Sequence, residues 1–197
     1  MATFSVRPCT PSDIEAMCAI YAHYIRTSTC TWAWPESDLP VASEWQAKLA
    51  AATARGLPWL VAEEGGSAAG NGAGAVAARL IGYCTVGEFR ARTGWRNTCE
   101  HSIYTLPEAQ RRGVGRALLS ACIEGCRAAR VACLVAVISV HPASGAGSAS
   151  CALHAALGFE NSGYLARAGS KFGLVLDCQF MSRQIVPLTA AAEGVQP

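Results

Sequence analysis

A short basic, glycine-rich segment carries the clearest chemical signal in this sequence. Residues 110–116 read Gln-Arg-Arg-Gly-Val-Gly-Arg and run directly into a strongly amphipathic stretch that predicts a helix. Glycines at 113 and 115 allow a ligand to approach the backbone closely, and the free N–H groups at a helix start favour an anion. Three arginines add positive charge at the same place. The combination predicts a binding loop for a diphosphate group.

Two common nucleotide-binding motifs do not occur in this segment. The pattern Gly-x-x-x-x-Gly-Lys-Ser/Thr is missing, and Leu118 breaks Gly-x-Gly-x-x-Gly. The segment is therefore neither a P-loop nor a dinucleotide fingerprint. From the residues alone, a solvated basic turn with chance glycines is the alternative to an anion site.

A carboxylate lies on the predicted strand that leads into this loop. Alternation along the strand places Glu100, Ser102 and Tyr104 on one face. A carboxylate in this position can accept a proton from an ammonium group, directly or through water. The alternative is a strand-edge acid paired to Arg96 or to another arginine.

The elements around the loop follow an α/β pattern in one domain. We expect strands near residues 4–7, 59–62, 81–86, 98–106, 133–140, 160–166 and 174–181, and helices near residues 10–25, 41–53, 112–128 and 151–157. They build a mixed central β-sheet flanked by helices over residues 1–186. Gly/Ala/Ser-rich stretches predict surface loops at 65–77 and 142–150, and residues 187–197 a flexible tail.

Composition excludes several classes of protein. The 197 residues are 51% hydrophobic and 15% charged with a net charge of +2, which argues against disorder, nucleic-acid binding and membrane association. No run of about 18 apolar residues and no secretory signal are visible, so we expect a cytoplasmic protein. The ten cysteines read as reduced, mostly buried thiols rather than a disulfide framework. No Cys-x-x-Cys pair occurs, so no metal site is expected.

Several separated segments resemble the GNAT superfamily of N-acetyltransferases. Residues 110–117 resemble its acetyl-CoA pyrophosphate loop. Residues 95–104, 153–159 and 171–173, together with Asp177 and residues 24–29, resemble the phosphinothricin acetyltransferase branch in particular. The resemblance extends from about residue 4 to residue 185, and it implies the GNAT fold.

The resemblance also implies an activity and the residues that perform it. Acetyl-CoA would donate its acetyl group to the primary amine of a small amino-acid-like acceptor, such as phosphinothricin or methionine sulfoximine or sulfone, by direct attack in a ternary complex. Glu100 would be the base and His154 would take part in catalysis, and a homodimer is implied. Tyr104 is a candidate to protonate the departing thiolate or to bind the thioester. The acetyl-CoA-binding residues would be Ile103, Tyr104, Thr105, Arg111, Arg112, Gly113, Val114, Gly115 and Arg116, with backbone N–H groups near Ile103 and Tyr104 on the thioester carbonyl.

Other functional groups are proposed for the acceptor. Arg90 and Arg92 could clamp a carboxylate, and Trp32, where the family has an aromatic residue, could form a wall of the amine pocket. Each has a structural alternative, because surface arginines are usually solvated and Trp32 could simply cover the core. His154 could likewise be a structural hydrogen-bonding residue, and Tyr104 a packing residue.

The chain departs from the family pattern at three places. The family has a CoA-contacting Asn after the strand at 133–140, and here His141 or Ser144 could replace it. The residues flanking the Lys-x-Gly segment are Ser170 and Val175 instead of aromatic residues, which predicts a reshaped acceptor pocket. A protein or peptide N-acetyltransferase and a non-catalytic CoA-binding regulatory module are therefore kept as alternatives.

Overall fold

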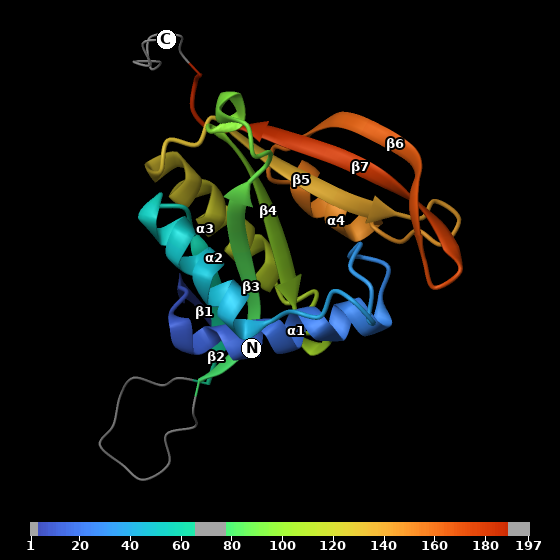
Figure 1. The fold of residues 1–197 in the computed structure, drawn as a ribbon, viewed down its shortest axis with the longest axis horizontal. Helices are drawn as coiled ribbons and strands as arrows, with labels where there is room; N and C mark the ends of the chain where they lie inside the picture. Colours follow the sequence, from blue (N-terminus) through green and yellow to red (C-terminus); the bar gives the residue numbers. More distant parts are fainter. Residues whose placement is uncertain (1–3, 66–77, 189–197) are drawn as a thin grey trace.

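The computed structural model describes residues 4–65 and 78–188 (Figure 1). Most of the predicted loop at 65–77 and of the predicted tail at 187–197 lies outside these ranges. The described chain forms one mixed sheet of seven strands in the order β1-β2-β3-β4-β5-β7-β6. No helix in the described part is long and apolar enough to cross a membrane.

The strands and helices follow the predicted order. The strands are β1 (Phe4–Pro8), β2 (Trp59–Glu64), β3 (Arg79–Glu88), β4 (Thr98–Thr105), β5 (Cys133–Val140), β6 (Glu160–Lys171) and β7 (Leu174–Gln184). The helices are α1 (Ile14–Thr27), α2 (Ala42–Ala54), α3 (Val114–Ala128) and α4 (Ser148–Ala155), with short 3-10 turns at Pro11–Asp13, Thr93–Trp95 and Pro107–Ala109.

Helices cover both faces of the sheet. In Figure 1, α1 and α2 lie in front of the sheet, whereas α3 lies behind β3 and β4 and α4 lies behind β5. The buried stripe of α3 includes Val114, Leu118, Cys122 and Cys126, at the three- and four-residue spacing of one helical face. All ten cysteines are free thiols, and six of them are buried. The six buried thiols pack as small hydrophobic residues, as expected.

The first helix begins at Ile14, after the 3-10 turn at Pro11–Asp13, instead of at residue 10. The starts of α3 and α4 also differ from the sequence prediction, each because of a glycine. Gly113 has a φ of +86°, so α3 begins at Val114 instead of residue 112. Gly147 also has a φ of +86°, and α4 begins after it, three residues earlier than predicted. Glycine adopts this left-handed backbone conformation without steric strain, and each helix begins at the residue after the glycine. Strands β6 and β7 also extend several residues beyond their predicted ends.

The sheet divides between β4 and β5, and this division positions the functional site. The two strands are parallel and pair only at Thr98↔Cys133, Cys99↔Leu134 and Glu100↔Val135. Beyond Glu100 they diverge, as Figure 1 shows, while β5 stays paired with β7 along its whole length. The result is a V-shaped opening in the middle of the sheet.

Candidate active site

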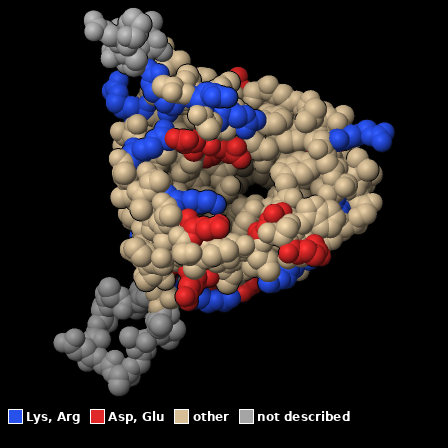
Figure 2. Space-filling view, viewed as in Figure 1, with Lys and Arg blue, Asp and Glu red and all other residues tan. Residues whose placement is uncertain are grey.

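A cavity of about 580 Å³ occupies the opening between β4 and β5. Figure 2 shows the molecule hollowed at this place, with acidic side chains flanking the opening. Its walls come from β4, β5, the start of α3, the start of α4 and the segment after α1. The lining residues include Tyr24, Cys30, Glu100, His101, Ser102, Ile103, Tyr104, Thr105, Gln110, Arg111, Gly113, Gly115, Arg116, Ser139, Gly147, Ser150, Leu153 and His154.

The start of α3 closes one end of this cavity with groups that suit a diphosphate. Arg111, Gly113, Gly115 and Arg116 all line it. Ala117 N–H donates to the carbonyl oxygen of Gly113 at 3.0 Å, so the N–H groups of residues 114–116 have no acceptor within the helix. These free donors and the positive end of the helix favour an anion.

Two residues of the predicted loop are directed elsewhere. The Arg112 side chain forms an ion pair with Glu64 on β2, with 2.5 Å between Nη2 and Oε2, and it does not line the cavity. The Val114 side chain is 1% exposed and belongs to the core. At these two positions only the backbone is available to a ligand in the cavity.

The free edge of β4 supplies backbone donors to the opening. Leu106 N–H donates to a carbonyl oxygen of β3, while Thr105 O, one residue earlier, accepts a hydrogen bond from Tyr24 Oη at 2.5 Å. Successive residues of a strand direct their backbone groups to opposite sides. Ile103, in phase with Thr105, therefore directs its N–H into the gap. Tyr104, in phase with Leu106, directs its own towards β3.

Glu100 lies where the two strands separate. It lines the main cavity and also a second cavity of about 450 Å³ under α2, and Ser102 is the other residue common to both. Burial raises the pKa of the Glu100 carboxyl, and the positive charge of Arg90 acts in the opposite direction. A carboxylate with a raised pKa is a better proton acceptor near neutral pH than an exposed one.

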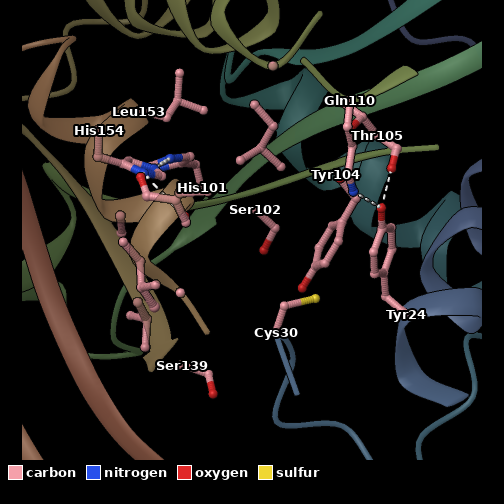
Figure 3. Close-up of a pocket in the computed structure, with 18 of the residues that line it drawn as sticks. Tyr24, Cys30, His101, Ser102, Tyr104, Thr105, Gln110, Ser139, Leu153 and His154 are labelled. Atoms are coloured by element: carbon pink, nitrogen blue, oxygen red, sulfur yellow. Dashed lines mark hydrogen bonds between the residues drawn. The ribbon is translucent and has the colours of Figure 1, made fainter. Parts of the chain in front are cut away.

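Tyr104 belongs to a cluster of aromatic rings. Its ring lies 5.2 Å from Tyr21, 5.5 Å from Tyr24 and 5.7 Å from Tyr83, measured between centroids. Figure 3 shows its hydroxyl directed towards Cys30 at the cavity. Burial raises the pKa of Tyr104, so the phenol stays protonated and available as a donor. The packing role and the donor role are compatible here.

His154 is buried and paired with a second histidine. Its Nε2 lies 2.9 Å from Nε2 of His101, and its Nδ1 lies 2.7 Å from the Ser150 carbonyl oxygen (Figure 3). His101 Nδ1 lies 3.0 Å from the Val135 carbonyl oxygen, and Phe159 packs against both rings. Burial lowers the pKa of both rings, and repulsion between the two rings lowers that of His101 further, to about 3.

The residues proposed for the acceptor lie around the site rather than in the lining of either cavity. Trp32 is half-buried, and its ring fills the space in which a Cβ on Gly169 of β6 would stand, 2.9 Å from Cζ3. Arg90 is exposed, with its guanidinium 4.2 Å from the Phe89 ring centre. Arg92 is exposed as well.

The departures from the family pattern also have definite places. His141 Nδ1 and Ser144 Oγ lie 2.8 Å apart in the loop before α4, and neither lines the cavity. Gly147, the residue that precedes α4, does line it. Ser170 and Val175 are cross-strand partners on the exposed β6–β7 hairpin.

Sequence reasoning missed several residues that line the cavity. Ser139 lies in the apolar strand β5, is 3% exposed, and its Oγ has no hydrogen-bond partner. A buried hydroxyl without a partner in a cavity wall is suited to a ligand. Cys30 and His101 also line the cavity and were not predicted. Their place in the site depends on long-range packing, although a lone serine in an otherwise apolar strand could have served as a signal.

Comparisons with known proteins agree with this geometry. The model of the acetyltransferase (GNAT) family matches residues 18–159, more than half of the chain. The chain is 35% identical to a phosphinothricin N-acetyltransferase of Alcaligenes faecalis, over 92% of this chain and 82% of that protein. It is 34% identical to an L-methionine sulfoximine/L-methionine sulfone acetyltransferase of Pseudomonas paraeruginosa, over 95% and 98%. A crystal structure of a GNAT superfamily phosphinothricin acetyltransferase from Sinorhizobium meliloti in complex with AcCoA superposes with a TM-score of 0.78 at 32% identity, covering 99% of this chain and 96% of that chain. The chain therefore belongs to the GNAT family of acetyltransferases.

Proposed function

We propose that this protein transfers the acetyl group of acetyl-CoA to the primary amine of a small amino-acid-like acceptor, by direct attack in a ternary complex. The observation that carries the proposal is that Glu100 and Ser102 line two cavities at once. One cavity is suited to a thioester bound beside β4. The other provides a separate approach for an amine from the side of α2.

Acetyl-CoA fits the main cavity by the chemistry of its donors. The free N–H groups at the start of α3, with Arg111 and Arg116, would hold the diphosphate. The unpaired edges of β4 and β5 would hold the amide-containing arm through backbone hydrogen bonds. Ser139, with its unpartnered hydroxyl, is a further polar group at this cavity, whereas His141 and Ser144 do not line it.

The chemistry follows from three groups. Glu100 would accept the proton of the acceptor ammonium, directly or through water, because burial raises its proton affinity. The N–H of Ile103 would donate to the thioester carbonyl oxygen and stabilise its developing negative charge. Tyr104 would donate a proton or a hydrogen bond to the departing thiolate, since its raised pKa keeps the phenol protonated.

The second cavity offers a cation for the acceptor carboxylate. Lys48 of α2 lines it, whereas Arg55 in the same wall is already paired with Glu88 at 2.9 Å. Arg90, which acts electrostatically on Glu100, is the second candidate. Trp32, which packs against Gly169 of β6, stays a proposed wall of the amine pocket. The names of the relatives from Alcaligenes faecalis and Pseudomonas paraeruginosa suggest phosphinothricin and methionine sulfoximine or sulfone as first compounds to test.

A homodimer in the cytoplasm is proposed as the working form, with residues 1–186 as the catalytic domain. Strand β6 is an edge strand, and Tyr164, Leu165 and Val175 on the β6–β7 hairpin are 50% or more exposed. An exposed edge with these apolar side chains is suited to contact with a second copy. Ten free thiols are typical of a reducing compartment.

The proposal is tested by following thiol release from acetyl-CoA with a panel of amines. Turnover with methionine sulfoximine or phosphinothricin, with a KM that rises in Lys48→Met or Arg90→Met, supports it. Turnover with peptides alone would instead identify a protein N-acetyltransferase. Binding of acetyl-CoA without turnover on any amine would identify a regulatory module.

A further inference from the structure

The two buried histidines at the cavity meet through the same ring nitrogen of each. The four ring nitrogens form a chain that begins and ends at a backbone carbonyl: Val135 O, His101, His154, Ser150 O. The three separations along it are 3.0, 2.9 and 2.7 Å. All three are hydrogen-bond distances.

The number of protons in this chain does not match two neutral rings. A carbonyl oxygen only accepts, so each Nδ1 has to carry a proton to bond with its carbonyl. A neutral imidazole has one N–H, and both are then used at the two ends of the chain. The Nε2 atoms of His101 and His154 would face one another as two acceptors 2.9 Å apart. Three protons, and one positive charge on the pair, satisfy all three contacts.

Moving a proton inwards does not remove the conflict. A ring that donates from Nε2 has a bare Nδ1 facing its carbonyl, so one of the three contacts stays repulsive for any neutral pair. The Ser150 hydroxyl oxygen lies 3.4 Å from His154 Nδ1, but the Ser150 carbonyl oxygen at 2.7 Å is the nearer group and still requires a proton on this nitrogen. Burial acts against the charge, because His101 is 5% exposed and His154 is 2% exposed. Burial thus lowers the pKa of the two rings. The Nε2···Nε2 contact, which has no proton in the neutral pair, favours the uptake of one proton. Repulsion between two charged rings opposes the uptake of a second proton.

The surroundings supply little other charge. The titratable groups on the neighbouring elements are Cys99, Glu100 and Tyr104 on β4, Cys133 on β5, Cys151 on α4, and Arg116, Cys122, Glu124, Cys126 and Arg127 on α3. No hydrogen bond or ion pair joins any of them to either ring in the described part of the chain, and Phe159 covers both rings. His154 lies in the last turn of α4, where the helix dipole favours a cation. Burial therefore has the largest effect on the proton affinity of each ring, and the other ring is the nearest group that can share a proton with it.

We propose that His101 and His154 form one proton-binding unit, in which His101 fixes the tautomer of His154 and the two Nε2 atoms share a single added proton. His101 is thereby a positioning residue for His154. Uptake transfers one proton to the pair and changes its charge from zero to +1, with no other bond made or broken. The unit lines the main cavity, so its charge state affects whatever is bound there. The inference deepens the part in catalysis that the family resemblance implies for His154, and it rests on the proposed function only for the activity measurement below.

Nitrogen-15 spectra of histidine-labelled full-length protein test the proton count directly. The chain has four histidines, and the two signals of the pair are assigned by their loss in His101→Phe and His154→Asn. At high pH we expect both rings to be protonated at Nδ1, the less common tautomer of free imidazole. On acidification both Nε2 signals should move together, with uptake of one proton by the pair. An Nε2–H tautomer on either ring at high pH, separate titrations that bind two protons, or no proton uptake before acid unfolding would each overturn the proposal.

Two substitutions of His101 separate positioning from simple packing. In His101→Phe, Nε2 of His154 faces a hydrocarbon ring, and we expect the pKa of His154 to fall by about one unit or more. In His101→Gln, the side-chain amide oxygen can accept from a protonated Nε2, so the pKa should lie above that in His101→Phe. The pH profile of kcat should shift in the same two directions. Equal pKa values of His154 in the two variants would contradict the positioning role, and this NMR result holds even if the protein acetylates none of the amines tested.

Discussion

At the scale of single residues, the site depends on polar groups held in surroundings that change their chemistry. Glu100 and Tyr104 lie on one face of β4, and burial raises the pKa of both side chains, which suits one as a base and the other as a donor. On β5, Ser139 has a buried hydroxyl without a partner. Because Ser139 also lines the main cavity, we propose that a bound ligand supplies the partner that its hydroxyl lacks.

Replacement of Glu100 by Gln should lower kcat by about two orders of magnitude or more, because it removes the proton acceptor. In the unmodified protein, Glu100 is protonated as the pH falls through its pKa, so activity should decline on the acid side, at a pH above that of an exposed carboxyl. The Gln variant should lose this acid limb. A pH–rate profile measures both effects, and acetyl-CoA affinity from calorimetry should hardly change.

The matched control for this substitution is Glu124→Gln, an exposed carboxylate on α3 paired with Arg127. It should retain kcat within about twofold. If Glu100→Gln keeps full activity across the pH range, another group is the base.

Ser139→Ala should leave the free energy of unfolding unchanged or raise it by up to about 1 kcal/mol, because the hydroxyl has no partner to lose. The KM for acetyl-CoA or for the acceptor should rise several-fold. Tyr83→Phe is the matched control, since the Tyr83 hydroxyl is also buried and unpartnered but lines neither cavity. Urea unfolding and steady-state kinetics on both variants decide the matter, and equal kinetic effects would remove Ser139 from the site.

At the scale of elements, the functional parts are held by a small number of junctions. The junction of β1 with α1 is fixed by Asp13, which accepts two hydrogen bonds from Arg7 and two from Thr10. The junction of β5 with α4 is fixed by Gly147. A Cβ at Gly147 would stand 2.5 Å from Ser139 O and 2.6 Å from Val140 Cγ1. Each junction sets where the next helix begins, and α4 carries His154.

The Asp13 junction predicts a stability that depends on pH. Its hydrogen bonds with Arg7, followed by those from Thr10, lower the pKa of Asp13 from 3.8 to about 2. A depressed carboxyl pKa contributes stability that is complete above about pH 4 and is lost as the pH falls towards 2. Asp13→Asn should therefore lower the free energy of unfolding by about 1–2 kcal/mol at pH 7, and by less near pH 3.

Denaturant unfolding at the two pH values measures this difference. Glu108→Gln provides the control, because the Glu108–Arg79 pair is more than half exposed and an exposed ion pair adds little to stability. A cost of Asp13→Asn that is the same at pH 7 and pH 3 would show that the carboxylate charge is not responsible.

Substitution of Gly147 should lower the stability of the protein by more than backbone strain alone would. Gly147→Ala should destabilise the protein by about 1–3 kcal/mol more than Gly145→Ala, because overpacking against β5 is added. Gly145 is the matched control, since its φ of +71° is also positive while the nearest atom to a Cβ there lies 4.0 Å away. Thermal unfolding of the two variants compares them, and similar losses would exclude the steric explanation.

At the scale of the whole molecule, the sheet consists of two halves that are joined by three residue pairs between β4 and β5. The main cavity lies in the division, so a ligand that fills it contacts both halves. Binding to the folded state alone stabilises a protein by about 2.7 kcal/mol at a ligand concentration of one hundred times Kd.

Acetyl-CoA at saturating concentration should therefore raise Tm by several degrees in a thermal unfolding experiment. Arg116→Gln, which removes a cation that lines the cavity, should reduce this increase. Arg112→Gln is the control of equal charge, since Arg112 is bound to Glu64 and its loss should leave the ligand-induced increase intact. If acetyl-CoA leaves Tm unchanged, or if Arg112→Gln has the larger effect, the diphosphate site has been placed wrongly.

The sequence by itself determined the parts of this protein that depend on local pattern. Apolar periodicity gave the order of strands and helices, and the glycines and arginines at 110–116 indicated the anion-binding helix start. These features are visible because a helix turn or a strand repeat is encoded within a few neighbouring residues. The residues that resemble the GNAT family pointed to the right fold and family for the same reason.

Only the tertiary structure decided what depends on residues far apart in the chain. The number of paired residues between β4 and β5 sets the width of the opening, and no local pattern encodes where two strands separate. The ion pair between Arg112 and Glu64 joins residues 48 positions apart, and it removes one arginine from the predicted site. The contact between His101 and His154, 53 positions apart, likewise exists only because β4 and α4 meet at the cavity wall. Spacing in sequence identifies which groups are present, whereas packing decides which of them share a cavity and a proton.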